Sequence, residues 1–272
     1  MRNEAKRAAR RAKSSPAFRI FARAGYAANG IVHGIIGVIV LVLALGGRGE
    51  GDQAGAFKAI VAVPIGFAAL WLLAVALWGL AAWHAAEGLL ARPDDDDARS
   101  ILRKWWRRIA EWGQTLVFAA LGLIAASVAL GARPNSDAVA EGASRGILSI
   151  PGGPFMLGAI GLAIGVGGIA FVVMGVRRSF EGQLELPEGP IGVWVKTLGV
   201  AGFIAKGIAL VVVGVLLLIA AVRVDPKAAG GLDGAIDALL RLPIGPWLAG
   251  LVGVGFLAYA VFCGFRARWA RL

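Results

Sequence analysis

Residues 25–30 read Gly-Tyr-Ala-Ala-Asn-Gly, and residues 202–207 read Gly-Phe-Ile-Ala-Lys-Gly. Each motif opens a long apolar run, and a further glycine follows twelve residues after each first glycine, at Gly37 and Gly214. A degenerate copy, Ala-Glu-Trp-Gly-Gln-Thr, occupies residues 110–115. Three copies along one chain indicate an internal repeat, which is the signature of a fold built from similar units.

A second motif follows each of these copies. In it, Gly-Ala lies nine residues before a proline, an aliphatic pair lies between them, and a glycine comes two residues after the proline. Each unit is therefore predicted to hold a helix, an outer loop that ends in a short amphipathic helix, and a second helix that begins at the proline. The motif occupies residues 55–66, 142–153 and 234–245, with its proline at Pro64, Pro151 and Pro243.

The hydrophobic residues gather in long, nearly charge-free runs. They make up 58% of the 272 residues, whereas 17% are charged, and this composition excludes an ordinary soluble domain, a disordered chain and a coiled coil. A helix needs about 20 apolar residues to cross the hydrocarbon core. We therefore predict an all-α integral membrane protein with six transmembrane helices, arranged as three tandem two-helix repeats around a pseudo-threefold axis. The predicted spans are 24–46, 65–90, 112–132, 154–175, 197–222 and 244–265.

The units and their connections divide the chain into six parts. A basic N-terminal arm precedes the first repeat, a linker with an interfacial helix follows that repeat, and a second linker leads into the third repeat. The predicted boundaries are 1–23 for the arm, 24–93, 112–179 and 197–272 for the repeats, and 94–111 and 180–196 for the linkers.

The positive charges predict the orientation. There are 28 Lys and Arg against 17 Asp and Glu, for a net charge of +11. The arm, the loops that follow the second and fourth spans, and the C-terminal tail hold 20 of them, whereas the opposite loops hold 7. Because Lys and Arg favour the cytoplasmic side of a membrane, we expect both termini to be cytoplasmic. The charge thus reflects topology, and nucleic acid is not an expected partner.

The repeated motifs resemble the bacterial membrane family called domain of unknown function 1206. The resemblance rests on the Gly-Tyr-Ala-Ala-x-Gly opening and the later Pro-x-Gly, covers almost all of residues 19–271, and is looser in the second unit. It implies this fold and a bacterial cytoplasmic membrane, and the family name carries no established activity. In that family the residue after the two alanines is commonly basic; Lys206 matches, whereas Asn29 and Gln114 are polar and uncharged.

Asn29, Gln114 and Lys206 occupy one position of the repeat. Polar groups within a span are costly and usually face protein or water. The three side chains could form a polar ring on the axis, where Lys206 would attract an anion or a lipid headgroup. Alternatively, they lie near the cytoplasmic interface, where lysine reaches water and amides bond to a neighbouring helix.

His33 and His84 are the two histidines, and Glu87 shares a helix face with His84. Two imidazoles and a carboxylate could ligate a metal, relay protons or hold haem. The other units do not repeat these residues, so we expect structural histidines bonded between helices, and no metal or cofactor. The one cysteine, Cys263, excludes an internal disulfide and a multi-thiolate metal site.

A basic, aromatic segment follows the four aspartates at 94–97, which we interpret as a solvated run rather than a cation site. Its aromatic residues fall on one broad helix face and its cations elsewhere, which is typical of an interfacial helix that attracts anionic lipid. The residues predicted to face lipid are Arg103, Lys104, Trp105, Trp106, Arg107 and Arg108.

The sequence contains no nucleophile–base motif, Walker lysine or zinc-protease motif, and catalytic residues are not expected. We expect a non-enzymatic module of the cell envelope that binds lipid or a membrane protein partner. The alternative is a transporter or channel for a small solute or ion, with a polar path formed by Asn29, Gln114 and Lys206.

Overall fold

The computed structural model describes residues 7, 9–11, 13–90, 98–186 and 188–272, apart from the side chains of residues 98–104 and 106. Within this part of the chain, six helices are long and apolar enough to cross a membrane, so the predicted multi-pass membrane fold is confirmed. The long helices are α2 (Pro16–Ala44), α4 (Gly66–Leu90), α5 (Ala98–Ala129), α7 (Gly153–Val176), α8 (Pro190–Arg223) and α10 (Gly245–Trp269).

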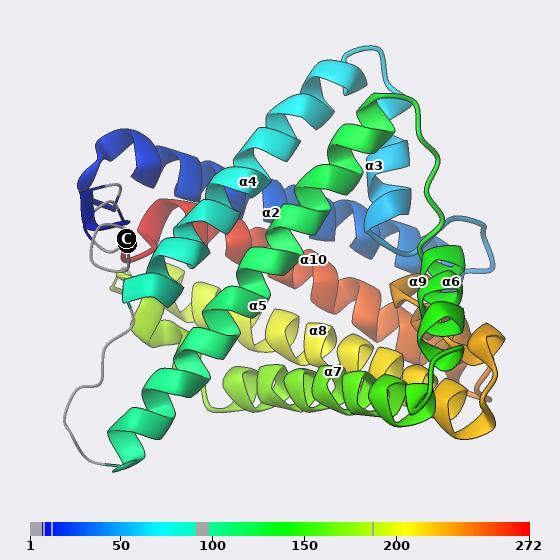
Figure 1. Ribbon diagram of the computed structural model, residues 1–272. Coiled ribbons are helices and arrows are strands. Elements are labelled where there is room, and N and C mark those ends of the chain that lie inside the picture. Colours follow the sequence, from blue (N-terminus) through cyan, green and yellow to red (C-terminus); the bar gives the residue numbers. More distant parts are fainter. Residues whose placement is uncertain (1–6, 8, 12, 91–97, 187) are drawn as a thin grey trace.

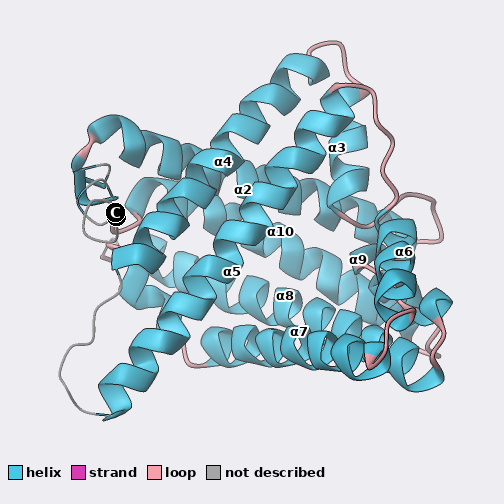
Figure 2. Ribbon diagram, in the orientation of Figure 1, coloured by secondary structure: helices cyan, strands magenta, loops and turns pink. Residues whose placement is uncertain are grey.

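The short helices occur once in each repeat, as predicted. They are α3 (Gln53–Val61), α6 (Ser136–Leu148) and α9 (Leu232–Leu240), and two 3₁₀ turns, η1 (Ser179–Gln183) and η2 (Pro226–Ala228), complete the order. Figure 1 shows the start of α2 and the end of α10 at one end of the bundle, called here the termini side. The helices α3, α6 and α9 lie toward the other end, called the loop side, and Figure 2 shows the loops that connect the helices there.

The long helices pack in a cyclic pattern. The second long helix of each repeat packs on the first of the next repeat: α4 on α5, α7 on α8, and α10 on α2. Within the first and third repeats the two long helices also pack together, α2 on α4 and α8 on α10. The structure describes the whole backbone of α5 and α7, and these two helices do not pack together in a comparable way. The ring of three repeats is therefore open in the middle repeat.

Glycines at equivalent positions allow the close contacts between repeats. A Cβ atom on Gly37 of α2 would lie 2.9 Å from the backbone oxygen of Gly253 in α10. Gly214 of α8 occupies the same place in its repeat, and its Cβ would lie 2.7 Å from the backbone oxygen of Gly161 in α7. The same two positions of the repeat thus form the α2–α10 contact and the α7–α8 contact. Both positions hold glycine, because a larger residue would keep the backbones apart.

The middle repeat lacks the contact that joins the long helices of the other two. A Cβ on Gly25 would lie 2.4 Å from Cβ of Leu80 in α4, and one on Gly202 would lie 2.6 Å from Cβ of Tyr259 in α10. The corresponding residue of α5, Ala110, is exposed. The degenerate motif at 110–115 therefore coincides with the place where the ring opens.

The second long helix of each repeat begins at the motif glycine, two residues after the predicted proline start. The first residues are Gly66, Gly153 and Gly245. Each donates its N–H to the backbone oxygen three residues earlier, at 2.8, 2.9 and 2.8 Å. A Cβ on each would lie 2.0, 2.0 and 2.5 Å from the backbone oxygen six residues earlier. The Pro-x-Gly motif therefore specifies a tight turn out of the short helix.

Three predicted boundaries differ from the structure because the helices continue through their charged ends. The predicted interfacial helix and the third span form one continuous helix, α5, which begins at Ala98. α2 begins at Pro16, inside the predicted arm, and α8 at Pro190, inside the predicted second linker. Asp94 to Asp97 lie outside the described residues. Lys and Arg are good helix formers, so charged residues at the end of an apolar run extend a helix rather than end it.

Candidate functional site

A cluster of polar side chains lies inside the bundle, where α2, α8 and α10 meet. We call Asn29, His33, Lys206, Tyr259 and Cys263 the inner cluster. Asn29 and His33 are 3% and 5% exposed. The Asn29 amide donates to Cys263 Sγ at 3.5 Å, and His33 Nδ1 lies 2.8 Å from the backbone oxygen of Asn29. Because a carbonyl oxygen only accepts, this contact places the imidazole proton on Nδ1.

Lys206 is held by aromatic rings. Its Nζ lies 4.9 Å from the ring centre of Tyr259 and 5.2 Å from that of Phe171 in α7. The His33 ring also contacts Tyr259, edge-on with the ring centres 4.8 Å apart. The ion pairs found among the described residues do not include Lys206. Cation–π contacts therefore take the place of a carboxylate partner.

Two of the three repeat-equivalent positions come together, and the third does not. Asn29 and Lys206 both contact α10, through Cys263 and Tyr259. Gln114 is half-buried on α5, a helix that packs on α4 and α3. The structure therefore does not assemble the predicted threefold ring as one cluster, because the opening of the middle repeat keeps α5 with the first repeat.

Asn29 and Lys206 instead face the repeat that precedes their own in the cyclic order, in which the third repeat precedes the first. Asn29 contacts Cys263 and Lys206 contacts Phe171. Both partners lie eighteen residues after the first glycine of their helices, and His84 holds this place in the first repeat. His84 in turn contacts α5 one turn to either side of Gln114. Counting from the Pro-x-Gly glycine would have found these partners in the sequence.

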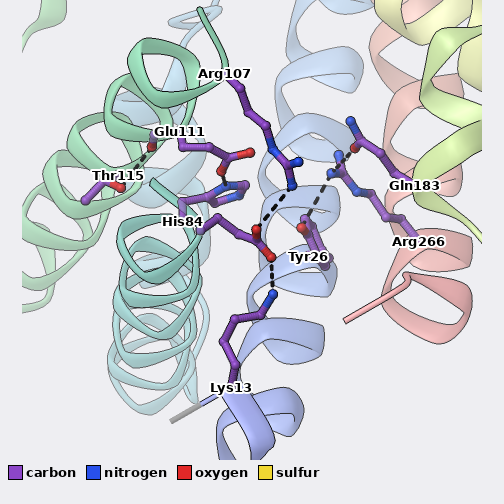
Figure 3. Close-up of polar contacts among 9 residues, drawn as sticks. Lys13, Tyr26, His84, Arg107, Glu111, Thr115, Gln183 and Arg266 are labelled. Carbon is purple, nitrogen blue, oxygen red and sulfur yellow. Dashed lines mark hydrogen bonds and ion pairs between the residues drawn. The ribbon is translucent and has the colours of Figure 1, made fainter. Parts of the chain in front are cut away.

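A second polar group lies between α4 and α5 (Figure 3). His84 Nδ1 lies 2.7 Å from Glu111 Oε2, and the His84 ring stacks on Phe118 at 5.4 Å. Glu87 accepts hydrogen bonds from Lys13 and from Arg107, the latter at 3.3 Å. Sequence analysis did not predict Glu111, although it lies three residues before Gln114.

The three residues proposed for a cofactor or proton relay thus have separate partners. His33 belongs to the inner cluster, His84 pairs with Glu111, and Glu87 pairs with cations. Among the described residues, no three His, Cys, Asp or Glu side chains lie together in a way that could hold a metal ion. His33, His84 and Glu87 are therefore not gathered into one metal site.

Tyr26 connects the second polar group to the end of α10. The Arg266 guanidinium lies 4.4 Å above the Tyr26 ring and donates to Gln183 Oε1 at 2.7 Å (Figure 3). The Tyr26 ring also meets His84 edge-on at 6.4 Å. Arg266 is therefore positioned by η1, which supplies Gln183, and its charge points inward from the last turns of α10.

The predicted lipid-facing segment is only partly described. The side chains of Arg103, Lys104 and Trp106 lie outside the described residues. Trp105 is 53% exposed, and the Arg108 guanidinium lies 5.3 Å from its ring while Arg108 Nε donates to the backbone oxygen of Gly88 at 3.2 Å. The Arg107 side chain is 61% exposed and also reaches Glu87. Arg107 and Arg108 therefore bond to α4 and still present surface at the termini side.

Carboxylates on the loop side join the repeats. Asp137 of α6 accepts hydrogen bonds from the backbone N–H of Gly231 and Gly234, at 2.7 and 3.1 Å, and so caps α9. Asp233 of α9 accepts from the N–H of Gly51 at 2.6 Å. The second repeat is thereby tied to the third, and the third to the first.

Asp233, one of the two carboxylates that join the repeats on the loop side, has a shifted pKa. Partial burial raises the pKa of its carboxyl from 3.8 to about 6; the Gly51 N–H opposes this effect, and the charges of Asp52, Asp137 and Asp237 add to it. Desolvation disfavours the charged form, and neighbouring carboxylates repel it. The fold therefore favours protonated Asp233.

We expect the stability of the protein to fall as pH rises from about 4 to about 6. A raised carboxyl pKa contributes stability that is present below the unfolded value and is lost through the folded value. The contribution is on the order of 1 kcal/mol, once the shift is discounted for a half-exposed group. Asp233→Asn keeps an oxygen for Gly51 and should abolish this slope in thermal unfolding, whereas Asp225→Asn should keep it. An unchanged slope in Asp233→Asn contradicts this assignment.

Comparison with known proteins matches the repeats. The family described as Domain of Unknown Function (DUF1206) matches residues 24–91, 112–178 and 201–270. The chain is also similar to the uncharacterized protein YxxB of Bacillus subtilis (strain 168), with 25% identity over 252 residues that cover 92% of this chain and 90% of the relative. No solved structure matches.

Proposed function

The chain belongs to the DUF1206 family, and from that premise we propose that it is a non-enzymatic module of the bacterial cytoplasmic membrane that binds anionic lipid at its termini side. Both termini are cytoplasmic in this proposal, and it requires no metal or cofactor. The excess of Lys and Arg on the arm, linkers and tail supports this orientation.

Two Arg–Trp pairs at the termini side carry the proposal, and each has one exposed and one half-buried member. Arg108 lies over Trp105 at 5.3 Å on α5, and Arg268 lies over Trp269 at 5.6 Å at the end of α10. Tryptophan favours the headgroup level of a bilayer, and cations there attract anionic lipid. Each pair therefore combines an interfacial anchor with a site for a lipid phosphate.

Native mass spectrometry of the detergent-purified protein tests this function. With equal amounts of phosphatidylglycerol and phosphatidylcholine, we expect the anionic lipid to be retained at least about fivefold more, since one basic residue near the surface contributes about 1 kcal/mol. Arg108→Gln should lower this preference. Arg145→Gln, which removes an exposed cation on the loop side, should not. Equal retention of the two lipids by the unmodified protein contradicts the proposal.

Transport of a small anion is the second candidate function, and the inner cluster supports it. A cation within a span is costly, so its presence there is a reason to consider a role in binding or conduction. Lys206 lies between aromatic rings, and Arg266 points inward from α10. Such a path would use Asn29 and Lys206 without Gln114.

A further inference from the structure

An apolar groove runs along the outer face of α10 near its termini-side end. It is shallow and largely open, has a volume of about 410 Å³ and is lined by Val261, Gly264, Phe265, Arg268 and Trp269. These residues recur every three or four positions and so share one face of the helix. Cys263 of the inner cluster is buried, so the groove is separate from the polar interior.

Gly264 creates the groove because it leaves a gap between larger neighbours. Gly264 is exposed, and a Cβ atom on it would have no heavy atom within 4 Å. Phe265 and Trp269 stack at 5.4 Å and form one wall, while Val261 is 51% exposed at the far end. The groove therefore offers an open, mainly apolar surface along which a hydrocarbon chain can lie.

Arg268 gives the groove one charged end. Its side chain is exposed, and its guanidinium lies 5.6 Å from the Trp269 ring. The neighbouring cations are engaged elsewhere: Arg266 bonds to Gln183 and Arg271 to the backbone oxygen of Gly182. The ion pairs found in the described part of the chain do not include Arg268. Among the described residues, therefore, no carboxylate neutralises the Arg268 guanidinium.

We propose that this groove binds one anionic phospholipid, with an acyl chain along Val261 and Gly264 and the phosphate at Arg268. From Arg268 to Val261 is two helical turns, about 10 Å along the axis. The charged end lies at the termini side and the apolar end points into the bilayer, which is the orientation of a lipid in that leaflet. The proposal rests on the proposed lipid-binding function and names one of its sites.

Gly264→Leu is the decisive variant, because a Cβ at this position has no heavy atom within 4 Å, so the larger side chain can occupy the groove without a clash at its base. Gly167→Leu on α7 is the matched control, since its Cβ also meets nothing within 4 Å. Arg268→Gln removes the charge and keeps the groove. Native mass spectrometry with phosphatidylglycerol and phosphatidylcholine reports the bound lipid, and thermal unfolding confirms that each variant is folded.

We expect Gly264→Leu to lose one bound phosphatidylglycerol and Arg268→Gln to retain it about fivefold less, while Gly167→Leu behaves as the unmodified protein. If the unmodified protein prefers phosphatidylglycerol and Gly264→Leu does so equally, this site is wrong although the lipid-binding function stands. If the unmodified protein shows no preference, the function itself fails. If Gly264→Leu instead dissociates a dimer, a second copy occupies the groove and the proposal is overturned.

Discussion

Gly153→Ala should leave little folded protein. The new Cβ would lie 2.0 Å from the backbone oxygen of Ile147, inside the turn that leads from α6 to α7. Because that contact is with backbone, the turn itself has to move, and we expect a loss of at least about 3 kcal/mol in stability. The yield of monodisperse protein and the midpoint of thermal unfolding measure this effect.

Gly167→Ala on the same helix is the control for this prediction. Its Cβ meets nothing within 4 Å, and alanine favours a helix over glycine, so stability should be unchanged or slightly higher. Equal stability of Gly153→Ala and Gly167→Ala would show that the turn is not as tight as the structure has it. Gly66→Ala should behave like Gly153→Ala, since its Cβ is equally close to a backbone oxygen.

Gly207→Leu should separate α7 from the rest of the bundle. A Cβ on Gly207 would lie 2.6 Å from the backbone oxygen of Gly168, and the larger side chain cannot fit there. Among the long helices, α7 packs closely on α8 alone. We expect a loss of at least about 3 kcal/mol and faster hydrogen exchange in α7 than in α2 or α4.

The matched control for this prediction is Gly167→Leu, which changes the residue beside Gly168 on a face of α7 that meets no other atom. It should leave hydrogen exchange in α7 near that of the unmodified protein. Uniformly faster exchange in all long helices of Gly207→Leu would mean that α7 is required for the whole fold rather than attached through this contact.

The spacing of the repeated motifs predicted the three units but not which helices pack together between them. The motifs at 25–30 and 202–207 correctly indicate repeated units, and each Pro-x-Gly correctly indicates a second helix. The partner of each contact belongs to another repeat, as with Gly37 and Gly253, and local patterns contain no information about that pairing. The opening between α5 and α7 was not predicted either, although it coincides with the degenerate motif at 110–115.

The candidate site was predicted in part for a similar reason. Asn29 and Lys206 are polar residues in apolar runs, and the structure places both against α10. Tyr259 and Cys263 carry no signal of their own, because aromatic and thiol side chains are ordinary in a span. The helix starts at Pro16 and Pro190 lie beyond the predicted spans. A span is recognised by its apolar residues, whereas the charged residues that precede it continue the helix equally well.

Cysteine accessibility tests the central claim most directly, namely that the inner cluster is packed and that function lies on the termini-side surface. In a Cys263→Ser background, which keeps a polar acceptor for Asn29, single cysteines replace Asn29, Gln114 and Lys206, with exposed Arg133 and Arg178 as loop controls. The protein is labelled in sealed vesicles, from each side, with a polar maleimide that does not cross membranes. The account predicts labelling of the loop controls and none at positions 29 and 206. Labelling at both interior positions would show a water-filled path and contradict it.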